Sequence, residues 1–275
     1  MRHLLITGLA LLLLSACATS PTGRSQLMLI SPEQAISESK SAYASTVTEV
    51  TKEHQLISDP AWTDRISTIT GRLVTEAIKK YPDTADWEWS VAIIDDPETL
   101  NAWCMAGGRM AIYSGIVTKL ELTDDEIAQI MGHEISHALA HHTAEKMSRA
   151  VLVNAGLAVT SKVTDQNGYV LTGSAIAAQL ALQLPNSRDA EREADEIGIE
   201  LATRAGYRPE AAVSLWRKMS EAGGGGPEFL STHPSPDNRM EMLRDLGNEL
   251  KPLNPSLTKS RVHPVRIVTN ADELR

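Results

Sequence analysis

Four histidines occur within ten residues of the stretch MGHEISHALAHH, which begins at Met131. Three residues of this stretch, His133, Glu134 and His137, form an HExxH pattern. Residues four positions apart share one face of a helix, so both imidazoles can bind the same ion. Zinc binds neutral imidazole readily and keeps one position for water in catalytic sites. Glu134 borders the same face, where its carboxylate can take a proton from a water molecule that zinc activates.

The other histidines of this stretch, His141 and His142, are predicted to lie outside the metal site. A helix rises about 1.5 Å per residue, so His141 lies about 12 Å along the axis from His133. His142 and Glu145 are too distant by the same measure. We therefore interpret these residues as polar or structural neighbours, and a third ligand must come from elsewhere in the chain.

The best donor of a third ligand is the acidic segment NSRDAEREADEIG, residues 186–198. The metzincin pattern would need glycine at position 140 and histidine at 143, but the chain has Ala140 and Thr143. Glu191 and Asp195 are four positions apart on one face of a predicted helix. One carboxylate can bind zinc while the other accepts the second imidazole N–H of a ligand. The alternative for this segment is a solvated acidic face.

The elements that carry these residues have clear start signals. Thr123 and Glu126 form a capping box before the histidine helix. In residues 87–96 polar and apolar side chains alternate and then give way to an apolar run, a pattern typical of strands. Residues 101–115 predict two short strands or one bent strand around a glycine pair. Further helices are predicted to begin at Ser31-Pro32, Asp59-Pro60, Ser187 and Pro209. Residues 150–184 predict buried helices around a polar turn at 165–168. The glycine run Gly223–Gly226 predicts a flexible joint.

The N-terminus has the features of an export signal. A short basic start precedes an apolar run, and Leu14-Ser15-Ala16-Cys17 resembles the lipobox of bacterial lipoproteins. We expect a signal peptide at 1–16, a tether at 17–30 lipid-anchored through Cys17, a zinc metallopeptidase domain at 31–250 and a C-terminal tail at 251–275. The alternative is ordinary cleavage near Ala16, which leaves an unlipidated protein.

The composition narrows the function classes. The 275 residues carry a formal net charge of −9, and no basic cluster follows a phosphate backbone, which argues against a general nucleic-acid binder. With Cys17 lipidated, Cys104 has no cysteine partner, so we predict that it is a small buried apolar residue.

The HExxH pattern, followed at a distance by Ser187-Arg188-x-x-Glu191-x-x-Ala194-Asp195, resembles a gluzincin family of zinc metalloproteases. This family contains the CAAX prenyl endopeptidases and the HtpX-like bacterial proteases, and the chain is most similar to its periplasmic lipoprotein branch. The resemblance covers roughly residues 31–247. Further matching pieces follow in order: Asn101-Ala102, Gly107-Gly108, Tyr113-Ser114-Gly115, Thr232-His233-Pro234 and Arg239.

The resemblance implies an α+β fold, a mainly helical zincin-like domain with a small β-sheet beside the active-site helix. It also implies one Zn²⁺ per chain, with Glu191 as the third ligand after His133 and His137. Asp195 would be the carboxylate behind a ligand histidine, and Glu193 would be a bystander. In zincins the substrate extends along an edge strand, for which the strand near Gly108–Tyr113 is the candidate.

Two residues of the resemblance, His233 and Arg239, match positions suited to stabilising the oxyanion of peptide hydrolysis. A structured turn and a surface charge are the alternatives. A third alternative is that His233 binds zinc as a fourth protein ligand, which would close the water position and hold the enzyme inactive.

The resulting expectation is a zinc endopeptidase, lipid-anchored at the periplasmic face of the outer membrane, that degrades misfolded or misassembled envelope proteins. Outer-membrane export is implied because Ala18 is not the aspartate that commonly retains lipoproteins at the inner membrane. One rival is a chaperone-like binding lipoprotein for outer-membrane assembly with a non-catalytic zinc. Another is a zinc-dependent hydrolase of cell-wall peptides. No nucleic-acid partner is expected.

Overall fold

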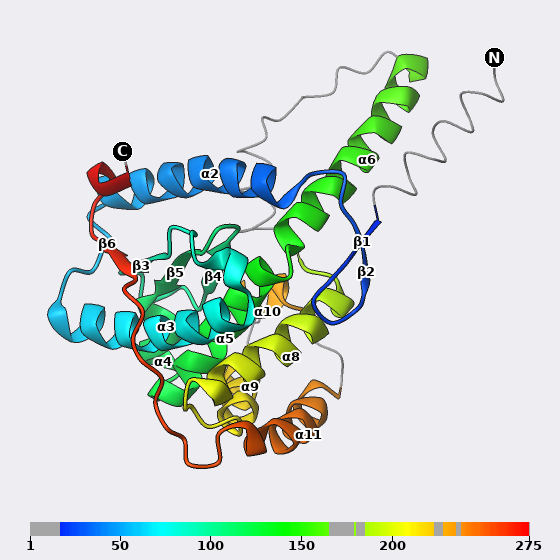
Figure 1. Ribbon diagram of the computed structural model, residues 1–275. Helices are drawn as coiled ribbons and strands as arrows, with labels where there is room; N and C mark the ends of the chain where they lie inside the picture. The colour runs from blue at the N-terminus through cyan, green and yellow to red at the C-terminus, as the bar shows by residue number, and fades with distance from the viewer. Residues whose placement is uncertain (1–16, 165–178, 180–184, 223–227, 235–237, 275) are drawn as a thin grey trace.

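A computed structural model describes residues 17–164, 179, 185–222, 228–234 and 238–274 of the chain. Its centre is a four-stranded sheet in the order β4-β5-β3-β6 (Figure 1). β3 pairs in parallel with β5 and β6, whereas β4 pairs antiparallel with β5. The strands are β3 (Ser90–Ile94), β4 (Ala102–Met105), β5 (Arg109–Tyr113) and β6 (Arg266–Val268).

Helices make up most of the described chain, so the predicted α+β class is confirmed. The N-terminal helices are α2 (Pro32–Lys52), α3 (Pro60–Lys80), α4 (Ser114–Lys119), α5 (Asp124–Leu139) and α6 (His142–Thr164). The C-terminal ones are α8 (Arg188–Arg204), α9 (Ala211–Glu221), α10 (Glu228–Thr232) and α11 (Arg239–Leu250). Short 3-10 turns occupy Pro82–Thr84, Lys251–Leu253 and Ala271–Leu274. Among the described residues, every helix is too short or too polar to cross a bilayer.

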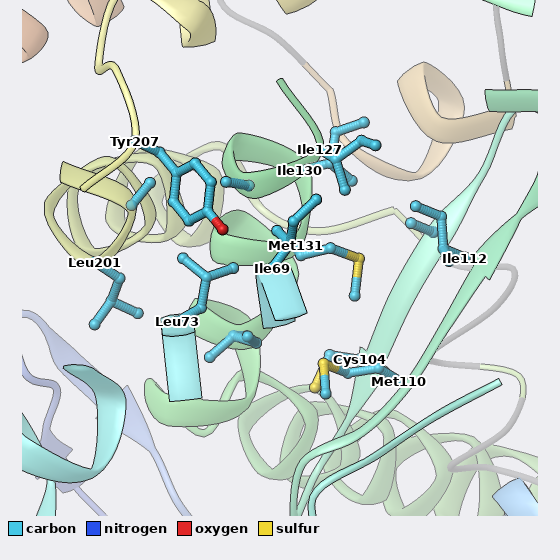
Figure 2. Close-up of a cluster of buried hydrophobic side chains, with 14 of the residues drawn as sticks. Ile69, Leu73, Cys104, Met110, Ile112, Ile127, Ile130, Met131, Leu201 and Tyr207 are labelled. Atoms are coloured by element: carbon cyan, nitrogen blue, oxygen red, sulfur yellow. The ribbon is translucent and has the colours of Figure 1, made fainter. Parts of the chain in front are cut away.

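Both faces of the sheet are buried, and strand alternation divides them between two cores. Val91 and Ile93 of β3 pack with α3, α5 and α8, whereas Ala92 and Ile94 pack with α2. Figure 2 shows the larger core, in which Ile69 and Leu73 of α3 meet Met131 of α5 and Met110 of β5. Cys104 lies in this core and is 6% exposed, as predicted.

The helix starts follow their sequence signals. The side chains of Ser31, Asp59, Thr123 and Ser187 each accept a backbone N–H at the first turn of the helix that follows. The segment predicted as one or two strands, 101–115, contains β4 and β5, and its last two residues begin α4. Gly107 and Gly108 turn between the strands with φ values of +83° and +79°, where glycine is favoured.

The strand predicted to lie at the sheet edge, Gly108–Tyr113, is instead interior. It forms β5, whose two sides pair with β3 and β4. The edge beside the histidine helix is β4, which contacts α5. The edge-strand prediction was therefore wrong. The chain reverses at Gly107-Gly108, and β4, the strand before this turn, forms the edge of the sheet.

Both terminal segments are built into the domain. Residues 17–30, expected to be a tether, contain an antiparallel hairpin of β1 (Cys17–Thr19) and β2 (Ser25–Leu27) beside α6 and α8 (Figure 1). Within 251–275, β6 extends the sheet at β3. Val151, Leu152 and Val153 of α6 are 41–60% exposed, which differs from the predicted buried helix. The predicted turn at 165–168 and the Gly223–Gly226 joint lie outside the described residues.

The helices α5 and α8 approach each other closely at Gly132 and Gly198. A Cβ atom added to Gly198 would lie 2.8 Å from the backbone nitrogen of His133 and 2.9 Å from the carbonyl carbon of Gly132. Those atoms are backbone and cannot rotate away, so the two helices approach at a distance that only glycine allows.

We predict that Gly198→Ala lowers the free energy of unfolding by about 1–3 kcal/mol, because the helices must separate. Denaturant unfolding measures the change. Gly247→Ala in α11 is the control, since its added Cβ would meet nothing closer than 3.5 Å. Equal stability of the two variants would contradict the proposed close contact.

Candidate active site

The helix α5 carries His133, Glu134 and His137 into the protein interior. Its first turn is closed by the predicted capping box, in which the Glu126 carboxylate accepts the Thr123 backbone N–H at 2.9 Å. From Glu126 to Leu139 every residue of the helix is buried. The HExxH side chains are therefore held by a helix with little freedom to move.

The helix does not continue through the surplus histidines, as the distance argument assumed. α5 ends at Leu139, His141 adopts φ +55°, and α6 begins at His142. This reversal returns the His142 ring to the first helix, where its Nδ1 lies 2.7 Å from Nδ1 of His137. His142 is therefore a direct neighbour of the site, although it lies outside the donor cluster.

Four side chains from three segments converge on one point: His133, His137, Glu191 and His233. One donor atom of each lies within 4.8 Å of all the others, and all four residues are buried. Within the described residues, these four form the group suited to hold a metal ion. His133, His137 and Glu191 are the ligands predicted from the sequence, and His233 is predicted to belong to the same site.

The separations in this cluster fit a tetrahedral metal. Nε2 of His133 lies 3.1 Å from Nε2 of His137, 3.4 Å from Oε2 of Glu191 and 3.2 Å from Nδ1 of His233. Ligands that each lie about 2.0–2.1 Å from one zinc ion are roughly 3.3–3.4 Å apart. The donor set, three imidazoles and one carboxylate, is one that zinc binds readily.

Asp195, predicted to stand behind a ligand histidine, lies beside His133. Its Oδ1 is 3.1 Å from Nδ1 of His133, so this imidazole donates Nδ1–H to the carboxylate and directs Nε2 into the cluster. Arg239, only 2% exposed, donates to Oδ1 of Asp195 at 2.7 Å and to Oε2 of Glu191 at 3.3 Å. Its guanidinium also stacks on Trp216, 3.5 Å from the ring centroid.

The position of Arg239 bears on its predicted role at the oxyanion. One Nη atom donates to Glu191, a member of the donor cluster, and the other donates to Asp195, which lies behind His133. This geometry favours a positioning role for Arg239 over direct contact with a substrate.

Glu134 lies beside the cluster and is 3% exposed. Its Oε1 has no hydrogen-bond partner among the described residues, and Nε2 of His233 lies 3.5 Å from it. Burial raises the pKa of Glu134 above its ordinary value, which makes the carboxylate a stronger base. An unpartnered buried oxygen of this kind is suited to bind and deprotonate a water molecule.

His233 is held by α10 and by ring stacking. Its backbone N–H donates to the Phe229 carbonyl at 2.9 Å, and the two rings stack with centroids 4.2 Å apart. Nδ1 of His233 lies 2.9 Å from Oε1 of Glu191. The ring therefore supplies the fourth potential donor of the cluster.

The charges in the cluster suit a bound cation. Burial opposes protonation of His133, but hydrogen bonds with Asp195 and Glu191 outweigh burial and raise its pKa to about 10. Burial lowers the pKa of His137 well below its ordinary value, so this ring is neutral. Burial would raise the pKa of Glu191, but the nearby His233 and His133 rings hold it well below its ordinary value. These shifts favour positive charge at the site, which a metal can supply in place of a proton.

Several neighbours of the site have no sequence pattern that predicts their position. Glu193, expected to be a bystander, is 3% exposed and accepts Nε2–H of His142 at 3.0 Å. Nδ2 of Asn186 lies 3.4 Å from Nε2 of His137 and 3.3 Å from Nδ1 of His233. Burial lowers the pKa of Lys146, in the same pocket as Glu134, to about 8. The acidic pattern of residues 186–198 was the one available signal, and it did not separate Glu193 from an exposed acidic residue.

Comparison with known proteins supports the same assignment. The model of the family described as Peptidase family M48 matches residues 60–246. Over 235 residues the chain is 31% identical to the mitochondrial metalloendopeptidase OMA1 of Bos taurus, covering 81% of the chain and 44% of that protein. Over 210 residues it is 29% identical to the beta-barrel assembly-enhancing protease of Yersinia pestis, covering 72% of the chain and 41% of that protein. The chain thus spans less than half the length of these curated relatives.

The region matched by the family model contains every predicted ligand and the predicted base. The narrower similarity to CAAX prenyl endopeptidases, HtpX-like proteases and periplasmic lipoproteins stays a prediction. The family model matches more than half of the chain, and α5 and α8 bring the HExxH histidines together with Glu191. The chain therefore belongs to peptidase family M48, a family of metallopeptidases.

Proposed function

We propose that the protein is a zinc-dependent endopeptidase, lipid-anchored at the periplasmic face of the outer membrane, that cleaves misfolded or misassembled envelope proteins. The observation that carries the catalytic part is Oε1 of Glu134, buried and unpartnered beside four metal-binding side chains. A structural metal site needs no such base, which argues against the chaperone-like binding lipoprotein.

Each residue of the proposed site has a separate role in hydrolysis. Zinc bound by His133, His137 and Glu191 would polarise the scissile carbonyl and the attacking water. Glu134 accepts the proton of that water and later gives it to the leaving amine. Asp195 keeps the His133 imidazole in the tautomer that presents Nε2 to the site.

The edge strand β4 is the element that we propose binds the substrate backbone. Trp103 and Cys104 of this strand line the pocket that contains Glu134, His137 and His233. An extended polypeptide can add to a sheet edge through its main-chain groups, without dependence on its sequence. That mode of binding suits unfolded protein segments as substrates.

The resting state is proposed to be closed. His233 takes the fourth corner of the cluster, so an attacking water has no vacant position until the ring moves. This arrangement favours the blocking role of His233 over the oxyanion role.

The proposed location rests on the N-terminal sequence and on one relative. Leu14-Ser15-Ala16-Cys17 resembles a lipobox. The name of the Yersinia pestis relative links that protein to assembly of β-barrels. The hydrolysis of cell-wall peptides stays an alternative that a substrate assay decides.

We predict that Glu134→Gln binds zinc like the wild type and loses casein hydrolysis by at least 100-fold, because the amide cannot accept the proton. Zinc content and casein cleavage are measured on the same preparation. Chelator treatment should abolish wild-type cleavage, and added zinc should restore it. Retained cleavage in the variant would refute the assigned base, and cleavage insensitive to chelators would refute the zinc mechanism.

Replacement of His233 by alanine is predicted to raise casein hydrolysis several-fold, because the fourth position opens for water. The rate is compared with that of the double variant His233→Ala, Glu134→Gln, which should be inactive if cleavage uses the assigned base. A fall in activity of the single variant would instead support the oxyanion role.

Replacement of Cys17 by serine is predicted to abolish incorporation of labelled palmitate and to release the protein from the membrane fraction. Cys104→Ser, which leaves the N-terminus intact, is the control and should stay membrane-bound. Membrane association of Cys17→Ser equal to the wild type would overturn the proposed anchor.

A further inference from the structure

The side of His137 that faces away from the donor cluster is connected to the N-terminal hairpin. Nδ1 of His137 lies 2.7 Å from Nδ1 of His142, and Nε2 of His142 lies 3.0 Å from Oε2 of Glu193. All three side chains are buried. Glu193 in turn accepts the hydroxyl of Thr22 at 2.8 Å and Nε–H of Arg24 at 3.0 Å.

The metal-binding Nε2 of His137 at one end and the Glu193 carboxylate at the other determine which ring nitrogens of His137 and His142 carry hydrogen. If Nε2 of His137 binds the metal, as the proposed function requires, its Nδ1 carries the hydrogen and donates to Nδ1 of His142. His142 then carries its own hydrogen on Nε2 and donates it to Glu193. A carboxylate at the far end is therefore needed to hold both imidazoles in the required tautomers.

Arg24 holds that carboxylate and a second one. Its Nη1 and Nη2 donate to both oxygens of Glu145 on α6 at 3.0 and 2.7 Å, while Nε binds Glu193 on α8. The Glu145 and Glu193 side chains are 5% and 2% exposed, and that of Arg24 is 20% exposed. Gln26 adds a bond from Nε2 to the Ala140 carbonyl at 2.7 Å, at the end of α5.

The two histidines of the HExxH pattern therefore have matching supports. Behind His133 stands Asp195, which Arg239 holds. Behind His137 stands His142, whose partner Glu193 is held by Arg24. The first support lies within the region matched by the family model, whereas Arg24 lies before it.

We propose that the β1–β2 hairpin is a positioning element of the metal centre. Arg24 and Thr22, acting through Glu193 and His142, fix the tautomer and orientation of His137. Docking of the residues that follow Cys17 thus sets the metal affinity of the site. This inference rests on the proposed function only in taking His137 as a ligand.

The test measures zinc binding by the full chain, with Arg24→Ala compared with Arg149→Ala. Both substitutions remove an arginine from Glu145, but Arg149 has no contact with Glu193 in the described structure. We expect Arg24→Ala to raise the zinc dissociation constant about 10–100-fold and to shift the visible bands of the cobalt-substituted protein. Arg149→Ala should change neither. Equal zinc affinity and equal cobalt spectra in the two variants would overturn the inference.

Three substitutions at two further positions test the same contacts without changing a residue of the hairpin. His142→Phe removes the acceptor for His137 and should weaken zinc binding, whereas His142→Gln keeps an acceptor and a donor and should restore part of the affinity. Glu193→Gln, of nearly the same shape, should weaken zinc binding and shift the cobalt bands even if Arg24→Ala does not fold. Wild-type affinity in both His142→Phe and Glu193→Gln would overturn the inference while leaving Glu134 and the proposed hydrolysis untouched.

Discussion

The backbone contact between α5 and α8 is the constraint on which the site depends. Because Gly132 and Gly198 have no side chains, the two helices meet backbone to backbone, immediately beside His133. That distance lets the carboxylates of Glu191 and Asp195 reach the imidazole of His133. A larger residue at either glycine would meet backbone atoms of the other helix within 3 Å and would force the two helices apart. The pair of glycines therefore links ordinary helix packing to the geometry of the donor cluster.

Charge balance explains why so many ionisable groups remain buried around the cluster. An isolated buried carboxylate is strongly unfavourable, so each one here has a partner that carries or donates a proton. Glu191 and Asp195 face Arg239, and Glu193 faces Arg24. Glu134 is the exception, since its Oε1 has no hydrogen-bond partner in the described residues. A buried oxygen kept unpartnered costs stability, and that cost is consistent with a base that must accept a proton from substrate water.

The sequence allowed the helices and the core of the site to be predicted, because local chemistry determines both. The capping residues set the helix starts, and the four-residue spacings placed His133 with His137 and Glu191 with Asp195. The site roles of His142 and Glu193 could not be predicted, because they depend on one left-handed residue, His141, that ends α5. In a continuous helix His142 would lie too far along the axis to contact the site. Because α5 ends at Leu139, the His142 ring instead lies against His137. The interior place of Gly108–Tyr113 in the sheet likewise depends on pairing with β3, which the strand's own sequence does not encode.

The supports of the two histidines come from segments far apart in the chain, and this has a consequence for folding. Arg24 binds Glu193, 169 positions later, and Arg239 binds Asp195, 44 positions earlier. Neither pair is local, so both can form only when the N-terminal hairpin, α8 and α11 have assembled around α5. The donor cluster is then complete only in the folded domain, and metal affinity becomes a measure of folding itself.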